Sequence, residues 1–193
     1  MKNVIIYSFL IVVFCSCTQK AATDLASKSK GDSALLASHI YPQSCYPSEI
    51  EAYLNDADKS GTNIRKSPNG EIIKTLIKDD VNFEYMLRLT TSQDGWFKIK
   101  NPITGSENDI NIPGGEGWIH GSVISVDTRN YQGEHLKLLD KPGDGETLVI
   151  FEDQAAGLHF IEMCGNWVKV EYNKHKGWIE SKWLCGNPLT TCS

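Results

Sequence analysis

The sequence lacks the local signatures of catalysis and of metal binding. Its histidines occur in neither the H-x-H nor the H-E-x-x-H spacing, and none stands beside a serine or cysteine in a nucleophile motif. The cysteines fit no zinc-binding spacing. We therefore expect no catalytic residue, no metal site and no cofactor, and we expect that the chain is not an enzyme. The histidines are His39, His120, His135, His159 and His175.

A basic surface and a membrane-spanning apolar run are also missing. The chain has 19 Lys and Arg against 24 Asp and Glu, a formal net charge of -5. A nucleic-acid partner is not expected, because a phosphate backbone needs a basic surface. The apolar stretch from Val4 to Phe14, interrupted by Ser8, is too short for the roughly 20 residues that span a bilayer.

The N-terminus has the order of a secretory leader. A lysine precedes the apolar stretch, and small or sulfur-containing residues follow it. Phe14-Cys15-Ser16-Cys17 resembles the lipobox of bacterial lipoproteins, whose last cysteine is acylated and becomes the first residue of the mature protein. The resemblance implies a signal peptide over residues 1–16 and lipidation of Cys17. A plain leader cleaved elsewhere, or an uncleaved anchor, is the alternative.

Residues 17–46 form a predicted tether. The segment is small, polar and poor in aromatic residues, so it buries too little apolar area to offset the entropy of ordering. Thr18-Gln19-Lys20-Ala21 has no aspartate at its second position. By resemblance to the sorting signals of Gram-negative lipoproteins, this implies a lipid anchor in the outer membrane, with the protein facing the periplasm.

The rest of the chain contains one sequence unit twice. DGWFKIK at residues 94–100 and GWIHGSVIS at 117–125 return as GNWVKVE at 165–171 and GWIESKWLC at 177–185. A repeat in fixed order indicates two copies of one small unit. The first copy has the longer internal loop, residues 101–116.

Both copies have the pattern of all-β units. Short apolar runs are separated by turn dipeptides such as Asn69-Gly70 and Asp94-Gly95. No long amphipathic helix interrupts these runs. The pattern predicts strands throughout both copies.

Each copy resembles a bacterial SH3-like domain. The second copy departs at its front, where Leu136-Lys137-Leu138 stands in for Asn63-Ile64-Arg65. The other matching positions are Ser67-Pro68, Gly95-Trp96-Phe97-Lys98-Ile99, Gly117-Trp118-Ile119 and Ser122 in the first copy, and Pro142, Trp167, Lys169 and Gly177-Trp178-Ile179 in the second. The resemblance implies an all-β fold of two tandem, small, partly open barrels. The expected domains are residues 47–126 and 136–193, joined by a linker at 127–135.

The resemblance also implies a function. Such domains commonly accompany cell-wall hydrolases and are thought to bind peptidoglycan peptides or protein partners. We therefore expect a non-catalytic lipoprotein of the cell envelope that binds cell-wall peptide or an envelope protein, and touches the membrane only through its lipid. The alternative is a regulator or inhibitor of a cell-wall or secreted hydrolase, acting by insertion of the loop at residues 101–116.

Tryptophans are the candidate ligand-binding residues, and all of them lie inside the repeats. In a strand, alternate side chains face opposite ways, so Phe97 and Ile99 face the core while Trp96 faces outward. Trp183 stands where the first copy has Val123, a position that by resemblance lines the peptide groove of eukaryotic SH3 domains. The alternative is that loops or the other copy cover these rings as additional core. The candidates are Trp96, Trp118, Trp167, Trp178 and Trp183.

Four cysteines remain after the leader and the lipidated position. In an exported chain they suggest two disulfides, and three connectivities are open. A bridge between Cys164 and Cys185 would stay within the second copy, and Cys45 with Cys192 would then tie the ends of the folded region together.

Asp56 to Gly61 is similar to the start of a calcium-binding loop. Position twelve of that loop is Ser67, which cannot supply the bidentate carboxylate that completes the oxygen shell. We expect instead that the Asp and Ser side chains cap an exposed turn.

Overall fold

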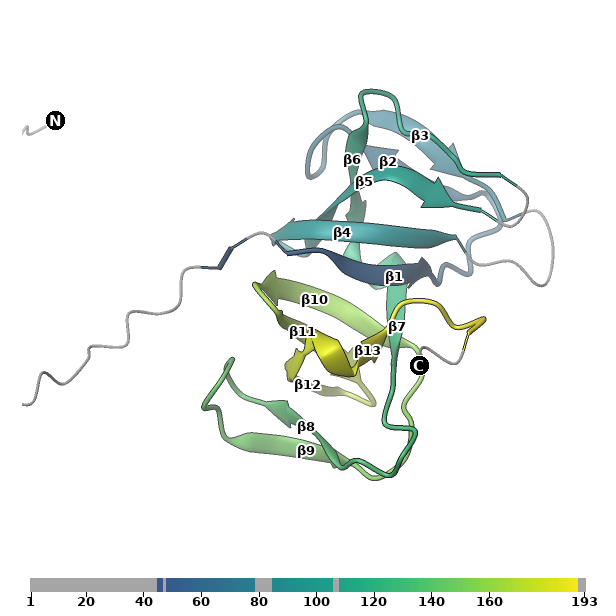
Figure 1. Ribbon diagram of the computed structural model, residues 1–193. Helices are drawn as coiled ribbons and strands as arrows, with labels where there is room; N and C mark the ends of the chain where they lie inside the picture. The colour runs from purple at the N-terminus through teal and green to yellow at the C-terminus, as the bar shows by residue number, and fades with distance from the viewer. Residues whose placement is uncertain (1–44, 47, 79–84, 106–107, 191–193) are drawn as a thin grey trace, which may run out of the picture. The chain divides into compact units, whose positions relative to one another are not determined.

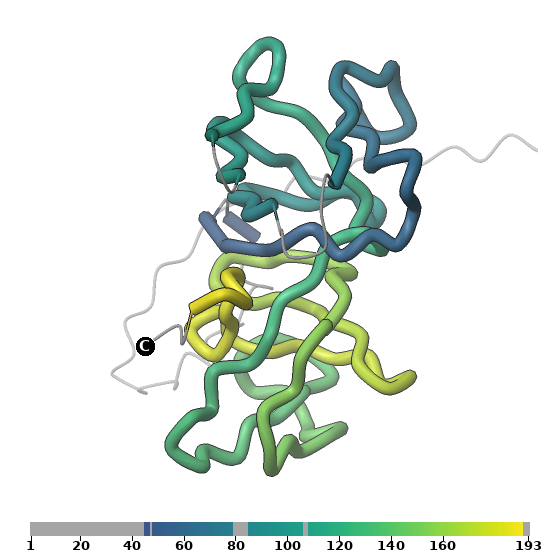
Figure 2. The backbone as a smooth tube through the Cα atoms, turned by 90° about the vertical axis from the view of Figure 1, so that its right-hand side faces the viewer, coloured from purple at the N-terminus to yellow at the C-terminus, as the bar shows by residue number. Residues whose placement is uncertain are grey.

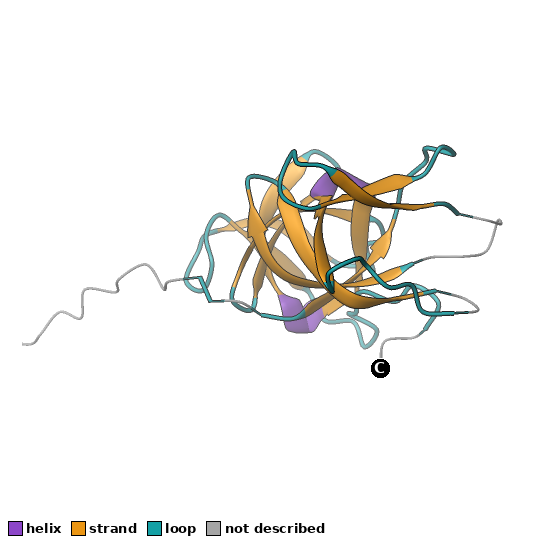
Figure 3. Ribbon diagram, turned by 90° about the horizontal axis from the view of Figure 1, so that it is seen from above, coloured by secondary structure: helices purple, strands orange, loops and turns teal. Residues whose placement is uncertain are grey.

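The described part of the chain is all-β, as the sequence predicts. The computed structural model describes residues 45–46, 48–78, 85–105 and 108–190, so Cys17, the predicted signal and most of the tether lie outside it, as does Cys192. Two 3-10 helices, η1 (Gly121–Val123) and η2 (Ser181–Trp183), lie among the strands (Figure 3). The strands, labelled in Figure 1, are β1 (Ile50–Leu54), β2 (Thr62–Arg65), β3 (Ile72–Leu76), β4 (Met86–Gln93), β5 (Trp96–Thr104), β6 (Glu116–His120), β7 (Ile124–Thr128), β8 (Leu136–Leu139), β9 (Thr147–Phe151), β10 (Leu158–Cys164), β11 (Trp167–Tyr172), β12 (His175–Glu180) and β13 (Leu184–Cys185).

The strands follow one open antiparallel path, in which the two copies have the same strand order. The path runs β3-β2-β6-β5-β4-β1 and continues β7-β10-β11-β12-β8-β9, while β13 pairs with β7 off the path. Read from its far end, the second half is β9-β8-β12-β11-β10-β7, which matches the first half strand for strand. The repeat in the sequence is therefore a repeat of topology.

β7 belongs to both copies. It pairs with β1 through Ile124 and Ser125, and with β10 through Ser125 and Val126. Its last two residues, Asp127 and Thr128, pair with β13. The strand thus closes the first copy and opens the second (Figure 2). The boundary expected between residues 126 and 127 falls inside this strand, and the division into domains stays a prediction.

The alternation of side chains in the central strands builds the core. Phe97, Ile99, Val168 and Val170 are fully buried, which confirms the predicted parity of β5 and β11. Apolar residues at every second position cover one face of a strand and leave the other for solvent. The buried residues of both copies form one hydrophobic cluster. Within it, the Phe97 and Phe160 rings pack edge to face, with their ring centres 5.5 Å apart.

The turn between β4 and β5 shows why glycine stands where it does. Gln93 pairs with Trp96, so Asp94 and Gly95 form a two-residue hairpin loop. Both have positive φ, +50° and +79°, as a type I′ turn requires. The predicted Asp-Gly turn is confirmed.

Of the three connectivities that the sequence leaves open, the suggested pairing of Cys164 with Cys185 and of Cys45 with Cys192 is wrong. Cys45 is bonded to Cys164, across a sequence separation of 119 residues, and Cys185 is also disulfide-bonded. The bridge attaches the segment before β1 to the end of β10. Proximity within one copy was a poor guide because β1 and β10 both lie beside β7 in the sheet.

The long loop of the first copy is anchored at its base. Ile103 and Ile112 are buried, and the Ile112 N–H donates to the Asn101 side chain at 2.7 Å. Ile103 and Ile110 form a β-bridge. Among the residues described, no helix is long and apolar enough to cross a membrane.

Candidate functional site

The turn at Asp56 is a capped turn. Asp56 accepts hydrogen bonds from the Asp58 N–H at 3.0 Å and from the Thr62 hydroxyl at 2.6 Å, and Asp58 accepts from the Ser60 N–H at 2.8 Å. This last bond lowers the pKa of Asp58. The expected capping is confirmed. The described residues contain no group of three metal-ligating side chains.

A serine–histidine pair that no local sequence motif marks joins the shared strand β7 to β10. Ser125 Oγ is 3.2 Å from His159 Nδ1, and the Asn55 side-chain amide donates to the same hydroxyl at 3.0 Å. Only the register of β7 with β10 brings the two residues together, so no local motif could reveal them. Ser125 is fully buried, so its hydroxyl cannot meet a substrate. The pair holds β1, β7 and β10 together.

In the first copy, polar side chains surround the outward indoles. The Trp96 ring meets the His120 ring edge to face at 5.1 Å, and the Arg65 guanidinium lies 6.0 Å from the Trp96 ring centre. Trp118 lies opposite Lys98 and Arg65 on the neighbouring strands. Both indoles are half-buried. This face presents cations and an imidazole around its aromatic rings.

In the second copy, the equivalent face opens into a cavity of about 180 Å³. Trp167 and Trp183 line it together with the half-buried Leu139, and Lys137 and Glu180 supply charges at the same cavity. Hereafter we call this the aromatic cleft. Two of the five candidate tryptophans are thus brought together in one hollow.

Three positions at the aromatic cleft differ between the copies: Glu180 stands in place of His120, Leu139 in place of Arg65, and Trp183 in place of Val123. Trp167 pairs with Glu180 as Trp96 pairs with His120, and Leu139 pairs with Trp178 as Arg65 pairs with Trp118. Trp183 ends η2 where Val123 ends η1. Leu139 in place of Arg65 removes a charge, and Trp183 in place of Val123 adds an aromatic ring to the lining of the cleft.

The alignment of the two copies at the front needs a correction of one residue. Leu139, not Leu138, has the place of Arg65 opposite a tryptophan of the closing strand. Leu138 corresponds instead to Ile64, since both are fully buried. The shift explains why Leu139 was missed as a residue of the cleft.

Trp178 and Trp183 differ in how much of the indole a ligand can reach. Trp178 is only 7% exposed, and the Lys169 ammonium lies 5.8 Å from its ring centre. Its burial leaves little of the ring for a ligand. Trp183 is half-buried and packs partly against the core, with the Lys182 ammonium 5.6 Å from its ring centre. Trp183 therefore supports the fold and lines the cleft at once.

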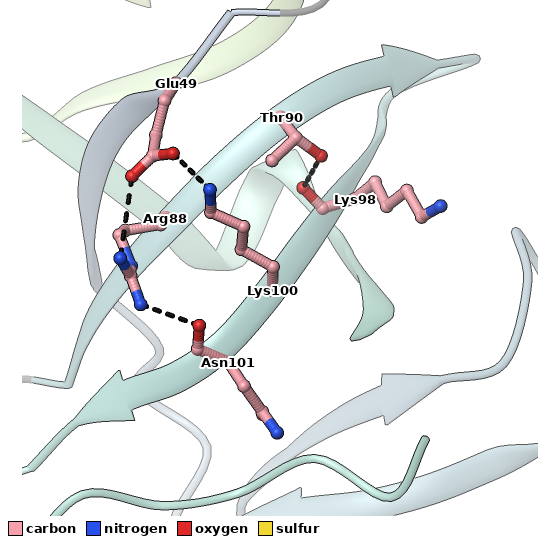
Figure 4. A network of polar contacts seen from close by, with 6 residues as sticks. All are labelled: Glu49, Arg88, Thr90, Lys98, Lys100 and Asn101. Atoms are coloured by element: carbon pink, nitrogen blue, oxygen red, sulfur yellow. Dashed lines mark hydrogen bonds and ion pairs between the residues drawn. The ribbon is translucent and has the colours of Figure 1, made fainter. Parts of the chain in front are cut away.

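A network of charges covers the outer face of β4 and β5 near the start of β1 (Figure 4). The Glu49 carboxylate receives the Lys100 ammonium and lies 3.6 Å from the Arg88 guanidinium. Arg88 also donates to the Asn101 carbonyl at 2.6 Å. The hydrogen bond from Lys100 is the main cause that holds the pKa of Glu49 below its ordinary value of 4.5.

We expect Glu49→Gln to lower the free energy of unfolding at pH 7 by less than about 1 kcal/mol, because the pair is largely exposed and screened. A depressed carboxyl pKa stabilises the fold above the unfolded-state value and stops doing so as pH falls through the folded-state value. The difference between variant and parent should therefore shrink below pH 4.5. Urea titrations at several pH values measure it, and a pH-independent difference would contradict the charge-based account.

Comparisons with known proteins add two structural likenesses. No protein-family model matches the chain, and no curated protein does. NlpC1 from Trichomonas vaginalis is similar at 12% identity with a TM-score of 0.31, over 74% of this chain and 48% of that one. NlpC2 from Trichomonas vaginalis is similar at 10% identity with a TM-score of 0.29, over 72% and 48%. The chain thus spans about half the length of these two structures, and no family is established by them.

Proposed function

We propose that this protein is a non-catalytic binding module of a bacterial cell envelope, and that its aromatic cleft binds a cell-wall peptide. One observation carries the proposal. Trp167 and Trp183 line the same cavity, beside Lys137 and Glu180. An indole offers a large apolar surface, while nearby charges select the polar groups of a ligand.

The size of the cleft favours part of a chain molecule over a whole small ligand. Pockets that enclose drug-sized ligands have about 300–1,000 Å³. The aromatic cleft has about 180 Å³, enough for one side chain or a short stretch of peptide. A peptide held there would continue over the neighbouring surface of the second copy.

The proposal includes the SH3-like repeats and the lipid anchor that the sequence predicts. Cys17 would carry the lipid, and residues 17–46 would hold the strands away from the outer membrane on its periplasmic side. Recovery of the full-length protein in the membrane fraction, with acyl groups on Cys17, is the result that this part requires.

The test replaces Trp183 by valine, the residue at the same place in the first copy. We expect Trp183→Val to keep the fold while it weakens binding to purified peptidoglycan stem peptides at least about tenfold. A tryptophan at the centre of a binding site commonly contributes about 2 kcal/mol or more, and 1.4 kcal/mol is tenfold in affinity. Calorimetric titration of the full-length protein measures the change.

Trp96→Val is the control on the first copy, because it makes the same change of side chain at the position there that corresponds to Trp167 of the aromatic cleft. It should leave peptide affinity within about twofold, a difference of roughly 0.4 kcal/mol. Circular dichroism confirms that both variants fold. If the parent fails to bind stem peptides, or if the two variants lose affinity equally, the aromatic cleft is not the site.

A further inference from the structure

A second and larger cavity is lined by other residues of η2 than the aromatic cleft is. It has about 490 Å³ and is lined by the start of β1, the residue after β7, η2, and β13 with the segment that follows. Four charged side chains line it, two acids from the β1 side and two bases, one from the residue after β7 and one from η2. They are Glu49, Glu51, Arg129 and Lys182. We call this cavity the polar pocket.

Two of these four charges are compensated from outside the polar pocket. Glu49 is held by Lys100 and Arg88, as described above. The Lys182 ammonium lies 2.5 Å from the Glu180 carboxylate. Each therefore has an opposite charge at hand without a ligand.

The other two charges, Glu51 and Arg129, have no ion pair among the described residues. Arg88 lies opposite Glu51 across the β1–β4 pair, but it is engaged by Glu49 and by the Asn101 carbonyl. Arg129 is half-buried, and its backbone N–H donates to the Trp183 carbonyl at 3.0 Å. Within the described part of the chain, the polar pocket thus contains one carboxylate and one guanidinium without an ion-pair partner.

The walls of the polar pocket are held in place without a ligand. The Ser48 hydroxyl donates to the Gly165 carbonyl at 2.5 Å, and the Ser181 N–H donates to the Asn166 carbonyl at 2.7 Å. Gly165 and Asn166 form the turn between β10 and β11. The disulfide from Cys45 to Cys164 ties the segment before β1 to this hairpin. A preformed pocket loses little conformational entropy when it binds.

We infer that the polar pocket binds a small zwitterion, an amino acid or short peptide with a free ammonium and a free carboxylate. A guanidinium pairs with a carboxylate through two parallel hydrogen bonds, and a carboxylate accepts from an ammonium. A ligand with negative charge alone would meet Glu49 and Glu51, and one with positive charge alone would meet Arg129 and Lys182. The volume lies within the range of small-ligand pockets.

The experiment titrates the full-length protein with the dipeptide Ala-Ala and follows the backbone amide resonances of the protein by NMR spectroscopy. Two further probes are N-acetyl-Ala-Ala, which lacks the ammonium, and Ala-Ala amide, which lacks the carboxylate. We expect each to bind at least about tenfold more weakly than Ala-Ala, since a hydrogen bond to a charged group contributes about 1.5–3 kcal/mol. Resonances of Asn166 and Lys182 should shift.

Two variants assign each charge to its partner. Arg129→Gln should abolish the preference for a free carboxylate, and Glu51→Gln the preference for a free ammonium. Lys59→Gln and Glu152→Gln change exposed charges outside the pocket and should leave both preferences as in the parent.

No resonance change at millimolar Ala-Ala would overturn the inference, as would equal binding of the three probes. The aromatic cleft is a separate site, so either result leaves the proposed function untouched. Conversely, Trp183→Val changes a side chain that lines the cleft and does not line the polar pocket.

Discussion

Phe97→Ala should lower the free energy of unfolding by about 3–5 kcal/mol, the usual cost of removing a buried aromatic ring. Phe97 is fully buried, and its ring packs against that of Phe160 in the second copy, with the ring centres 5.5 Å apart. The residual cavity would therefore lie where the two copies meet. We expect urea denaturation to show one transition, shifted to lower urea, by intrinsic fluorescence and by circular dichroism alike.

The expected single transition tests whether the two copies unfold together. Most domains have only about 5–15 kcal/mol of stability, so Phe97→Leu serves if the alanine variant does not fold. Tyr131→Ala is the control, because Tyr131 is 44% exposed and its loss should change stability by no more than about 0.5 kcal/mol. Two separate transitions, with only the first shifted, would show that the copies unfold independently.

Replacing both Cys45 and Cys164 by alanine should cost about 2–5 kcal/mol of stability, because the bridge closes a long loop and restricts the unfolded chain. The sequence separation of the pair is 119 residues. Changing both residues leaves no free thiol behind and leaves the bond of Cys185 in place. Guanidinium denaturation of variant and parent under oxidising conditions gives the difference.

Peptide mapping without reduction checks the connectivity on which this prediction depends. A proteolytic fragment with Cys45 should be linked to one with Cys164. A fragment joining Cys164 to Cys185 would mean that the pairing is different. Equal stability of the double variant and the parent would show that the bridge contributes nothing to the fold.

The sequence by itself determined the all-β class, the repeat, the turn at Asp94-Gly95 and the burial of Phe97 and Val168. Each depends on local chemistry. Side chains alternate along a strand, a two-residue hairpin needs positive φ, and a repeated pattern folds into a repeated topology. Trp167 and Trp183 were also within reach as lining residues of the aromatic cleft, because parity places Trp167 on the outer face and the repeat places Trp183 in the closing turn.

Only the tertiary structure decided how the copies join and how the aromatic cleft is completed. Nothing local shows that β7 pairs with β1, β10 and β13, or that Cys45 meets Cys164. The partner of Leu139 likewise depends on the register of β8 with β12, which a one-residue slip in the alignment of the copies concealed. Pairing between distant strands is set by how a whole apolar surface is covered, and no short stretch of sequence records which strand will cover it.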